Sequence, residues 1–275
     1  MRIVDTHAHI YHADEQLYPM KPDPYRPPAG MGTVEHLRRD MAANGVERVV
    51  LVQTGSAYRW DNRLLADTAD ACRDWAVGVC TLDPAAEGSV TVLERLVREK
   101  NVKGVRMETA TGGVYHHAGS ERLWQAAGRL GAVVCAHLSG DLLGELDVLL
   151  QRFPEVPVVL DHCAYPDPAR GVDDPIVQRL CRLAARPQLY PKLSFGVTNS
   201  RQQYPFADSL PLLQRIIATY GPDRCLWGSG FPCEHWLRKA TYGQHLDLFR
   251  IELGLSPAEQ EGILARTPLR VWFAP

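Results

Sequence analysis

The chain has 275 residues, of which 45% are hydrophobic and 23% are charged, and its formal net charge is −2. This length is ordinary for an α/β barrel and is large enough to bury a substantial core. The nearly balanced charge gives no sign of a nucleic-acid partner or an anionic-membrane partner.

Seven cysteines are scattered along the chain. Most of them stand in apolar surroundings, and their odd number and unpaired spacing argue against a disulfide framework or a zinc knuckle. No signal peptide is recognisable at the start, and no apolar run approaches membrane-spanning length. These features predict a soluble, reduced, cytoplasmic protein, for which a homo-oligomer is possible.

Short β-type runs alternate with helix-like segments along nearly the whole length. Several of these runs are almost continuous valine, leucine and isoleucine, which is typical of a parallel sheet buried on both faces. The eight predicted strands are Ile3 to His9, Arg48 to Thr54, Ala76 to Leu82, Val102 to Met107, Ala132 to Leu138, Val156 to Cys163, Tyr190 to Phe195 and Cys225 to Ser229.

The intervening segments carry helix signals. Thr33 is a plausible N-cap, and Gly45, Gly131 and Gly221 stand where helix C-caps are expected. The predicted helices include one opening over Val34 to Met41, then Glu121 to Leu130, Leu142 to Phe153, Pro175 to Ala185 and Leu210 to Tyr220. The pattern predicts a single (β/α)8 TIM barrel over residues 1–275. A doubly wound open sheet is the alternative, but no glycine-rich phosphate fingerprint follows the first strand.

The first predicted strand ends in two histidines one residue apart. Because alternate residues of an extended strand point to the same side, His7 and His9 present two imidazoles to one point. Neutral imidazole is a common ligand of zinc and other divalent metals. A lone His-x-His can also be two polar residues at a strand end, so the other strand ends decide its meaning.

Three later strands also end in residues suited to chemistry, namely Arg106, His137 and His162. In a barrel the C-terminal strand ends converge on one mouth, so all these side chains are expected to share one polar site. Arg106 can grip a carboxylate through two parallel hydrogen bonds, and its alternative role is an ion pair with Glu108. Either of the later histidines, taken singly, can be purely structural.

Further polar residues after the strands favour an anionic or hydroxyl-rich ligand. Ser56 and Tyr58 follow strand two, and Tyr115 follows strand four, although a solvated loop is the default interpretation of each group. Lys192 and Ser194 alternate along strand seven and therefore face one side together. The predicted substrate-binding residues are Ser56, Tyr58, Arg106, Tyr115, Lys192 and, after strand eight, Gly230.

These residues resemble the amidohydrolase superfamily, specifically the amidohydrolase-2 group of metal-dependent TIM-barrel hydrolases. That group includes 2-pyrone-4,6-dicarboxylate lactonase, sugar-acid lactonases of the fuconolactonase type and related decarboxylases. The resemblance covers nearly the whole chain and rests on Asp5-Thr6-His7-Ala8-His9, Tyr18-Pro19, Ser56 to Asn62, Gly104-Val105-Arg106, Asp161-His162, Lys192-Leu193-Ser194 and Trp227-Gly228-Ser229.

The resemblance implies a role for each residue of the mouth. His7 and His9 would be metal ligands or substrate contacts, and His137 would be the ligand from strand five. His162 would polarise the carbonyl or act in proton transfer, and Arg106 would hold a substrate carboxylate. Lactonases of this group can work without a metal, so the resemblance does not require one.

One motif departs from the family at the eighth predicted strand. The family pattern is Gly-Ser-Asp-aromatic-Pro, whereas the residues here are Gly228-Ser229-Gly230-Phe231-Pro232. The aspartate that would bind metal and take the proton of water is absent, and glycine has no side chain to accept a proton. Three explanations compete: a replacement that traps a substrate or product, takeover by a neighbour such as Glu234 or Asp161, or a reaction other than hydrolysis.

The sequence therefore predicts an amidohydrolase-like enzyme that hydrolyses a small carboxylated lactone or related cyclic acid. In the ordinary mechanism water attacks a carbonyl, and His162, with or without a metal, stabilises the oxyanion. The alternatives are a decarboxylase, cyclase or isomerase on the same scaffold, and a barrel that binds a ligand without turnover. Because one anionic ligand is missing, a divalent ion such as zinc or manganese at His7, His9 and His137 is expected to be weakly bound or absent.

Overall fold

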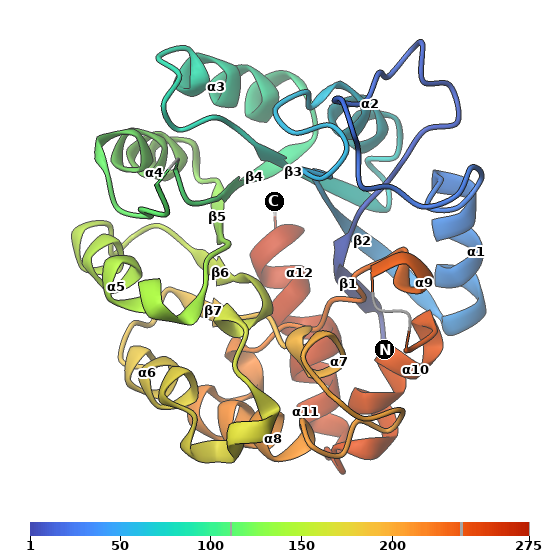
Figure 1. Ribbon diagram of the computed structural model, residues 1–275, viewed down its shortest axis with the longest axis vertical. Coiled ribbons are helices and arrows are strands. Elements are labelled where there is room, and N and C mark those ends of the chain that lie inside the picture. Colours follow the sequence, from blue (N-terminus) through green and yellow to red (C-terminus); the bar gives the residue numbers. More distant parts are fainter. Residues whose placement is uncertain (111, 237–238, 275) are drawn as a thin grey trace.

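The computed structural model describes residues 1–110, 112–236 and 239–274. Seven parallel strands form one curled sheet in the order of the sequence, with helices around it (Figure 1). The strands are β1 (Ile3–Ala8), β2 (Val46–Val52), β3 (Ala76–Thr81), β4 (Val102–Met107), β5 (Val133–Ala136), β6 (Val158–Leu160) and β7 (Leu189–Pro191).

The helices begin and end close to the signals in the sequence. The Thr33 side chain accepts a hydrogen bond from the His36 amide, and Gly45 and Gly131 end their helices in the left-handed conformation, at φ 69° and 65°. Among the described residues, no helix is both long and apolar enough to cross a membrane. The helices are α1 (Val34–Asn44), α2 (Arg63–Ala71), α3 (Ser89–Glu99), α4 (Ala118–Leu130), α5 (Leu143–Arg152), α6 (Pro175–Leu183), α7 (Phe195–Thr198), α8 (Leu210–Tyr220), α9 (Cys233–Trp236), α10 (Tyr242–Asp247), α11 (Pro257–Glu261) and α12 (Thr267–Trp272).

Residues 225–231, hereafter the closing segment, lie between β7 and β1 but form no regular strand. The Leu226 amide donates to the Pro191 carbonyl at 3.1 Å, and the Gly230 amide donates to the His7 carbonyl at 2.9 Å. Its β-type pairing with the two neighbours consists, in the described part of the chain, of isolated bridges. The prediction of an eighth strand at Cys225 to Ser229 is therefore not confirmed. The backbone also leaves the extended region at Gly230, whose φ is 67°.

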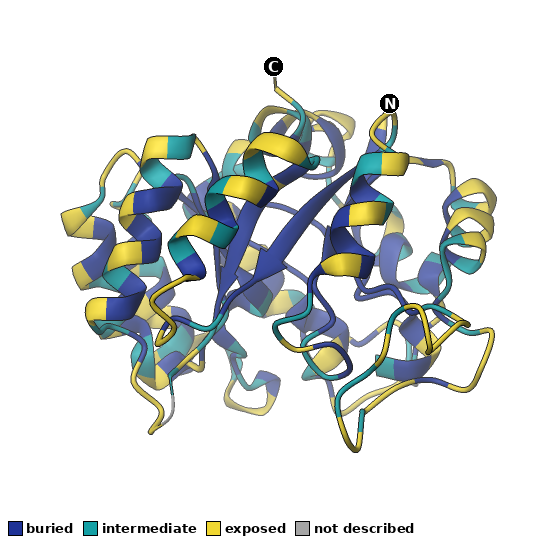
Figure 2. Ribbon diagram, turned by 90° about the horizontal axis from the view of Figure 1, so that it is seen from above, coloured by how far each residue is buried: buried dark blue, intermediate teal, exposed yellow. Residues whose placement is uncertain are grey.

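The inside of the curled sheet is filled by apolar side chains. One cluster joins valines of β2, β3, β5 and β6 to Leu226 and to Trp272 of α12, which is only 1% exposed. The strands are buried, and exposed residues lie on the outer faces of the helices and in the loops (Figure 2). Both termini lie at one end of the molecule (Figure 2). Since β1 begins there, the C-terminal strand ends open at the opposite end.

Candidate active site

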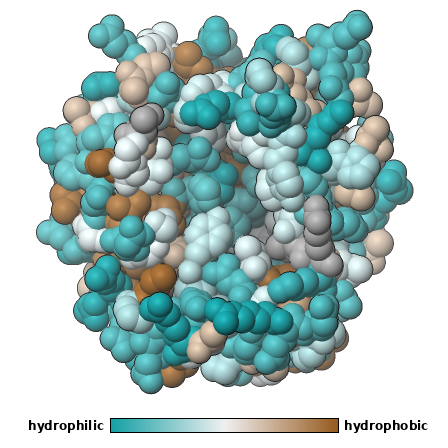
Figure 3. All heavy atoms as spheres, viewed as in Figure 1, coloured by the Kyte–Doolittle hydropathy of each residue, from teal (hydrophilic) through white to brown (hydrophobic). Residues whose placement is uncertain are grey.

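A cavity of about 300 Å³ lies at the C-terminal ends of the strands. Its volume is at the lower end of the range for small-molecule pockets. Hydrophilic residues predominate on the face seen in Figure 3. The lining residues are His7, His9, Thr54, Gly55, Ser56, Arg106, Glu108, His137, His162, Tyr165, Ser194, Thr198, Ser229, Gly230 and Trp236.

The structure brings most of the predicted site residues to this cavity. Those that line it are His7, His9, Ser56, Arg106, His137, His162 and Gly230. Tyr58, Tyr115 and Lys192 lie outside the lining. The Tyr58 hydroxyl accepts a hydrogen bond from the His12 amide at 3.1 Å, and Tyr115 is fully buried. Lys192 is fully buried and is in contact with residues of the cavity wall.

Lys192 belongs to a buried ion network. Its ammonium donates to Asp161 Oδ1 at 2.7 Å, while Arg106 Nε donates to Asp161 Oδ2 at 2.8 Å. Arg106 Nη1 also lies 3.6 Å from Glu108 Oε1. Burial alone would raise the pKa of Asp161, but the charges of Lys192 and Arg106 outweigh it and hold that pKa far below its usual value. Arg106 therefore has two carboxylate partners before any ligand arrives.

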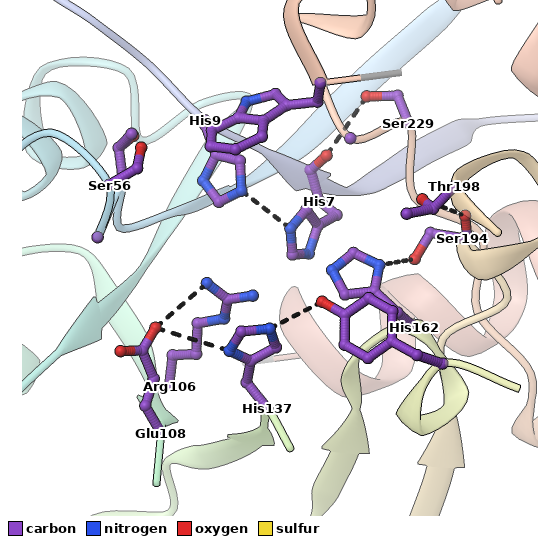
Figure 4. Close-up of a pocket in the computed structure, with 15 residues that line it drawn as sticks. His7, His9, Ser56, Arg106, Glu108, His137, His162, Ser194, Thr198 and Ser229 are labelled. Carbon is purple, nitrogen blue, oxygen red and sulfur yellow. Dashed lines mark hydrogen bonds and ion pairs between the residues drawn. The ribbon is translucent and has the colours of Figure 1, made fainter. Parts of the chain in front are cut away.

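Lys192 also fixes the state of the two histidines of β1. Its ammonium lies 3.1 Å from His7 Nδ1, and His7 Nε2 lies 3.1 Å from His9 Nε2. An ammonium can only donate, so His7 Nδ1 accepts and the ring proton sits on His7 Nε2. That N–H donates to His9 Nε2, and His9 Nδ1–H donates to the Val52 carbonyl at 2.9 Å. Each group in this series of hydrogen bonds, from the Lys192 ammonium to the Val52 carbonyl, has a partner. Figure 4 shows the contact between the two rings.

All four imidazoles of the cavity favour the neutral form. Burial is the largest cause in each case. It lowers the pKa of His9 to about 3, with the Arg106 charge adding to the effect. Burial and then the Lys192 charge hold the pKa of His7 well below its usual value. The pKa values of His137 and His162 are lowered too, so both rings are neutral, and each has one nitrogen that donates and one that accepts.

By proximity, His7, Asp161 and His162 form a group that could hold a metal ion. However, the Lys192 ammonium already binds the Asp161 carboxylate and His7 Nδ1, as a bound cation would. The His7 tautomer fixed by Lys192 also places a proton, not a lone pair, on His7 Nε2. Metal ligation requires a free lone pair on the nitrogen. The donor set in this arrangement therefore does not fit a divalent metal.

His137 is the centre of a second set of contacts, drawn in Figure 4. Its Nε2 lies 2.8 Å from the Tyr165 hydroxyl, and its Nδ1 lies 3.6 Å from Glu108 Oε1. The contact with His137 is the main cause that lowers the pKa of Glu108, and the Arg106 charge adds to it against burial. Burial raises the pKa of Tyr165, which therefore remains a phenol at neutral pH.

A left-handed turn after β6 carries His162 and Tyr165 to the cavity. The four consecutive non-glycine residues from His162 to Tyr165 have φ between 51° and 60°. This conformation costs roughly 1–2 kcal/mol for each residue with a side chain. Such strain is commonly kept at functional sites. The Ser194 hydroxyl lies 2.7 Å from His162 Nδ1, which leaves the other ring nitrogen directed toward the cavity (Figure 4).

Sequence reasoning missed several residues of the cavity. Tyr165 and Trp236 were not predicted, and Glu108 entered only as an alternative partner of Arg106. Asp161, which lies behind the lining, entered only in a family motif and as a possible substitute for the missing aspartate. The position of Glu108 was readable, because it stands two residues after Arg106 and strand periodicity places both on one face. No periodicity could reveal Tyr165, since its position depends on the left-handed turn.

The chain is similar to known amidohydrolases in sequence and in fold. Residues 4–274 match the family model described as amidohydrolase. A 4-sulfomuconolactone hydrolase of Hydrogenophaga intermedia is 25% identical, over 98% of this chain and 88% of the relative. A D-galactarolactone isomerase of Agrobacterium fabrum is 27% identical, over 93% of this chain and 85% of the relative. An amidohydrolase structure from Burkholderia multivorans with bound zinc has a TM-score of 0.82 at 22% identity and full coverage of both chains, which shows a shared fold.

Proposed function

The chain belongs to the amidohydrolase family, and we propose that it hydrolyses a small carboxylated lactone or related cyclic acid. The observation that carries the proposal is the convergence of four neutral imidazoles and Arg106 on one small cavity. The lactone-hydrolase relative supports the same reaction class. Hydrolysis of a lactone needs a bound acid group, a polarised carbonyl and proton transfer, and the cavity offers residue types suited to each.

In this proposal Arg106 holds the substrate carboxylate. Its Nε and Nη1 face Asp161 and Glu108. The substrate carboxylate therefore binds the N–H groups that remain on the side of the guanidinium lining the cavity. His162 directs a ring nitrogen at the lactone carbonyl and is held by Ser194. Donors aimed at the developing oxyanion lower the barrier to water attack. Ser56 and Gly230 complete the binding surface, and His137 acts in proton transfer.

Any divalent metal is proposed to bind weakly or not at all. The Lys192 ammonium supplies the fixed positive charge beside His7 and Asp161. A bound zinc or manganese ion would polarise the carbonyl and lower the pKa of water, but the donor set above does not fit one. The proposed roles of the residues are therefore assigned without a metal.

The finer architecture is also proposed. The closing segment takes the place of an eighth strand and completes a TM barrel that forms a single domain over residues 1–275. Its support is the pair of bridges from Lys192 to Leu226 and from Ala8 to Phe231. The interior cluster that joins Leu226 to the valines of β2 and β6 supports the same closure.

Lactone isomerisation is the second candidate function. It is favoured by the isomerase relative and by Gly230, which brings no side chain to activate water. In an isomerisation a substrate hydroxyl replaces water as the nucleophile, and the ring oxygen leaves as before. The cavity residues would have the same binding roles.

The test is a panel of carboxylated lactones, including sulfomuconolactones and aldarolactones, followed by product analysis. Hydrolysis predicts a ring-opened hydroxy acid and uptake of one oxygen from labelled water. Isomerisation predicts a second lactone without label. Protein incubated with chelator and then checked for metal should keep its activity. No turnover of any lactone, with or without added zinc or manganese, would refute the proposed function.

A further inference from the structure

The Tyr165 hydroxyl lines the cavity and lies 2.8 Å from His137 Nε2, so it can exchange a proton with that ring. We propose that Tyr165, acting through His137 with Glu108 behind it, is the proton shuttle of this cavity. The inference rests on the proposed lactone chemistry for its substrate, but its hydrogen-bond order can be tested without any substrate. It gives a catalytic role to a residue that the sequence patterns did not indicate.

The order of the hydrogen bonds follows from what each group can donate. The ionised Glu108 carboxylate can only accept, so the proton of neutral His137 sits on Nδ1, which faces it at 3.6 Å. His137 Nε2 then carries a lone pair and accepts the Tyr165 O–H at 2.8 Å. The carboxylate contact is longer than an ideal hydrogen bond, and such contacts often tighten only when substrate binds.

This order repeats the logic of an activated hydroxyl. A hydroxyl next to an imidazole, which is in turn oriented by a carboxylate, can pass its proton to the ring. All three groups line the same cavity. Tyr165 is held in place by its backbone, since its amide donates to the His162 carbonyl at 2.9 Å within the left-handed turn. The strain in that turn is accounted for if the phenol must point at His137.

The proton balance closes without any further reactant. The attacking water gives one proton to the Tyr165 oxygen, while Tyr165 passes its own proton to His137 Nε2. The remaining hydroxide forms a bond to the lactone carbonyl carbon. When the acyl bond to the ring oxygen breaks, that oxygen takes a proton from Tyr165, which recovers its own from His137. One water is consumed, and Glu108 stabilises the transient imidazolium.

The other candidates are less well placed for this task. Gly230 of the closing segment has no side chain, and Asp161 is bound by two cations. The ring N–H of His7 donates a hydrogen bond to His9 Nε2, so neither nitrogen is free to take a proton from water. His162 is directed at the carbonyl in the proposed function. Tyr165 with His137 is thus a pair at the cavity whose contacts, continued to Glu108, already form a path for a proton.

The kinetic test compares Tyr165→Phe with Tyr220→Phe. The second variant also loses a buried phenol hydrogen bond, to the Leu180 carbonyl at 2.7 Å, but that tyrosine lies on α8 outside the cavity lining. We expect Tyr165→Phe to lower kcat by roughly 100-fold to 10,000-fold with little change in KM, the range typical of acid–base groups. Tyr220→Phe should keep parental kcat. Unchanged kcat with raised KM would make Tyr165 a binding residue and overturn the shuttle.

A double variant tests whether Tyr165 and His137 act as one unit. Residues that act together give losses that do not multiply. Tyr165→Phe combined with His137→Gln should therefore be about as slow as the slower single variant. Losses that multiply fully would separate the two residues and contradict the proposal.

The tautomer of His137 provides a measurement that needs no turnover. Nitrogen-15 NMR of the imidazoles, assigned with His137→Gln, should show a proton on Nδ1 and a hydrogen-bonded lone pair on Nε2. The Nε2 signal should move in Tyr165→Phe and remain in Tyr220→Phe. A proton on Nε2 would overturn the shuttle whatever the activity. The expected tautomer in a protein that turns over no lactone would refute the proposed function and leave the hydrogen-bond order standing.

Discussion

The wall of the cavity formed by β4 and the ends of β5 and β6 contrasts with the closing segment on the other side. The first, hereafter the charged wall, comprises Asp161, Arg106, Glu108, His137 and Tyr165, and each of these side chains contacts the next in that order. The closing segment, residues 225–231, contains no aspartate, glutamate, histidine, lysine or arginine. The closing segment thus brings none of these ionisable side chains to the cavity, whereas the charged wall brings several.

The closing segment is held by backbone and small polar groups instead. The Ser229 hydroxyl donates to Asp5 Oδ2 at 2.6 Å, and the Gly230 amide donates to the His7 carbonyl at 2.9 Å. Asp5 is fully buried beneath the cavity and also accepts from Tyr242 at 2.9 Å. One side of the cavity is therefore arranged for charge and proton transfer, whereas the other side fixes its shape.

The largest effect is expected for Asp161→Asn, which keeps the shape of the side chain but removes its charge. Lys192 and Arg106 would then be buried cations without their carboxylate partner. Breaking a buried ion pair from one side costs roughly 3–5 kcal/mol of unfolding free energy. Urea denaturation measures the change.

The surface pair of Asp61 with Arg63 is the matched control. Asp61→Asn removes a carboxylate from a side chain that is 33% exposed, and exposed pairs contribute about 1 kcal/mol or less. Equal losses for the two variants would mean that the charged wall does not depend on its buried carboxylate.

The charged wall also shows how far sequence could reach. Strand periodicity correctly placed Arg106, His137 and His162 at one mouth, because the parallel strands end at the same edge. It could not decide between the two roles considered for Arg106, since the choice depends on where Glu108 points in space. The structure shows that ion pair at 3.6 Å, together with the shorter one to Asp161.

Other features depended on local backbone geometry that residue patterns do not encode. Tyr165 reaches the cavity only because four non-glycine residues adopt positive φ. The eighth predicted strand had an apolar start at Leu226 and Trp227, but it forms only isolated bridges. Tyr58 and Tyr115 follow the predicted strands, yet their side chains pack away from the cavity lining. Position after a strand does not determine the direction of a loop side chain.

The next largest effect is expected for Arg106→Lys. The lysine keeps one positive charge but loses the planar fork that serves Asp161 and a ligand together. Loss of a charged hydrogen bond is worth roughly 1.5–3 kcal/mol, so the affinity for a carboxylated lactone should fall about tenfold to a hundredfold. Calorimetric titration with substrate or product measures this.

Arg63→Lys on the surface is the control for a lost bidentate arginine and should bind the ligand as the parent does. If Arg106→Lys also binds as tightly as the parent, the carboxylate must be recognised elsewhere. In that case Arg106 would serve only the ion pairs within the charged wall.

A smaller effect concerns stability at acidic pH. The cavity histidines have lowered pKa values in the folded state, so the unfolded state binds more protons as pH falls below about 6.5. Folding stability should therefore be greatest above that pH and decrease toward pH 5. For His9 the loss continues until its folded pKa of about 3.

His9→Asn removes one of the histidines that bind a proton on unfolding at acidic pH. The slope of unfolding free energy against pH should become shallower by up to about 1.4 kcal/mol per pH unit, the value for one proton. His12→Asn, outside the cavity lining, serves as the control and should leave most of the slope. Denaturant unfolding between pH 5 and 8 measures both. An unchanged slope in His9→Asn would show that His9 is not kept neutral by burial.

The smallest effect is expected at the closing segment, for Gly230→Asp. Residue 230 has φ 67°, where a side chain is strained, but aspartate tolerates this region better than alanine. Gly230→Asp should therefore cost about 1 kcal/mol of stability, and Gly230→Ala should cost somewhat more. Because the proton path lies on the charged wall, hydrolysis by Gly230→Asp should stay within about tenfold of the parent.

Gly230→Asn has a similar shape without the charge and separates strain from electrostatics. If Gly230→Asp raises hydrolysis by about a hundredfold, as a positioned general base does, and Gly230→Asn does not, then the closing segment is the proper place for the proton acceptor. The contrast between the two sides would then describe a lost group, not a division of tasks.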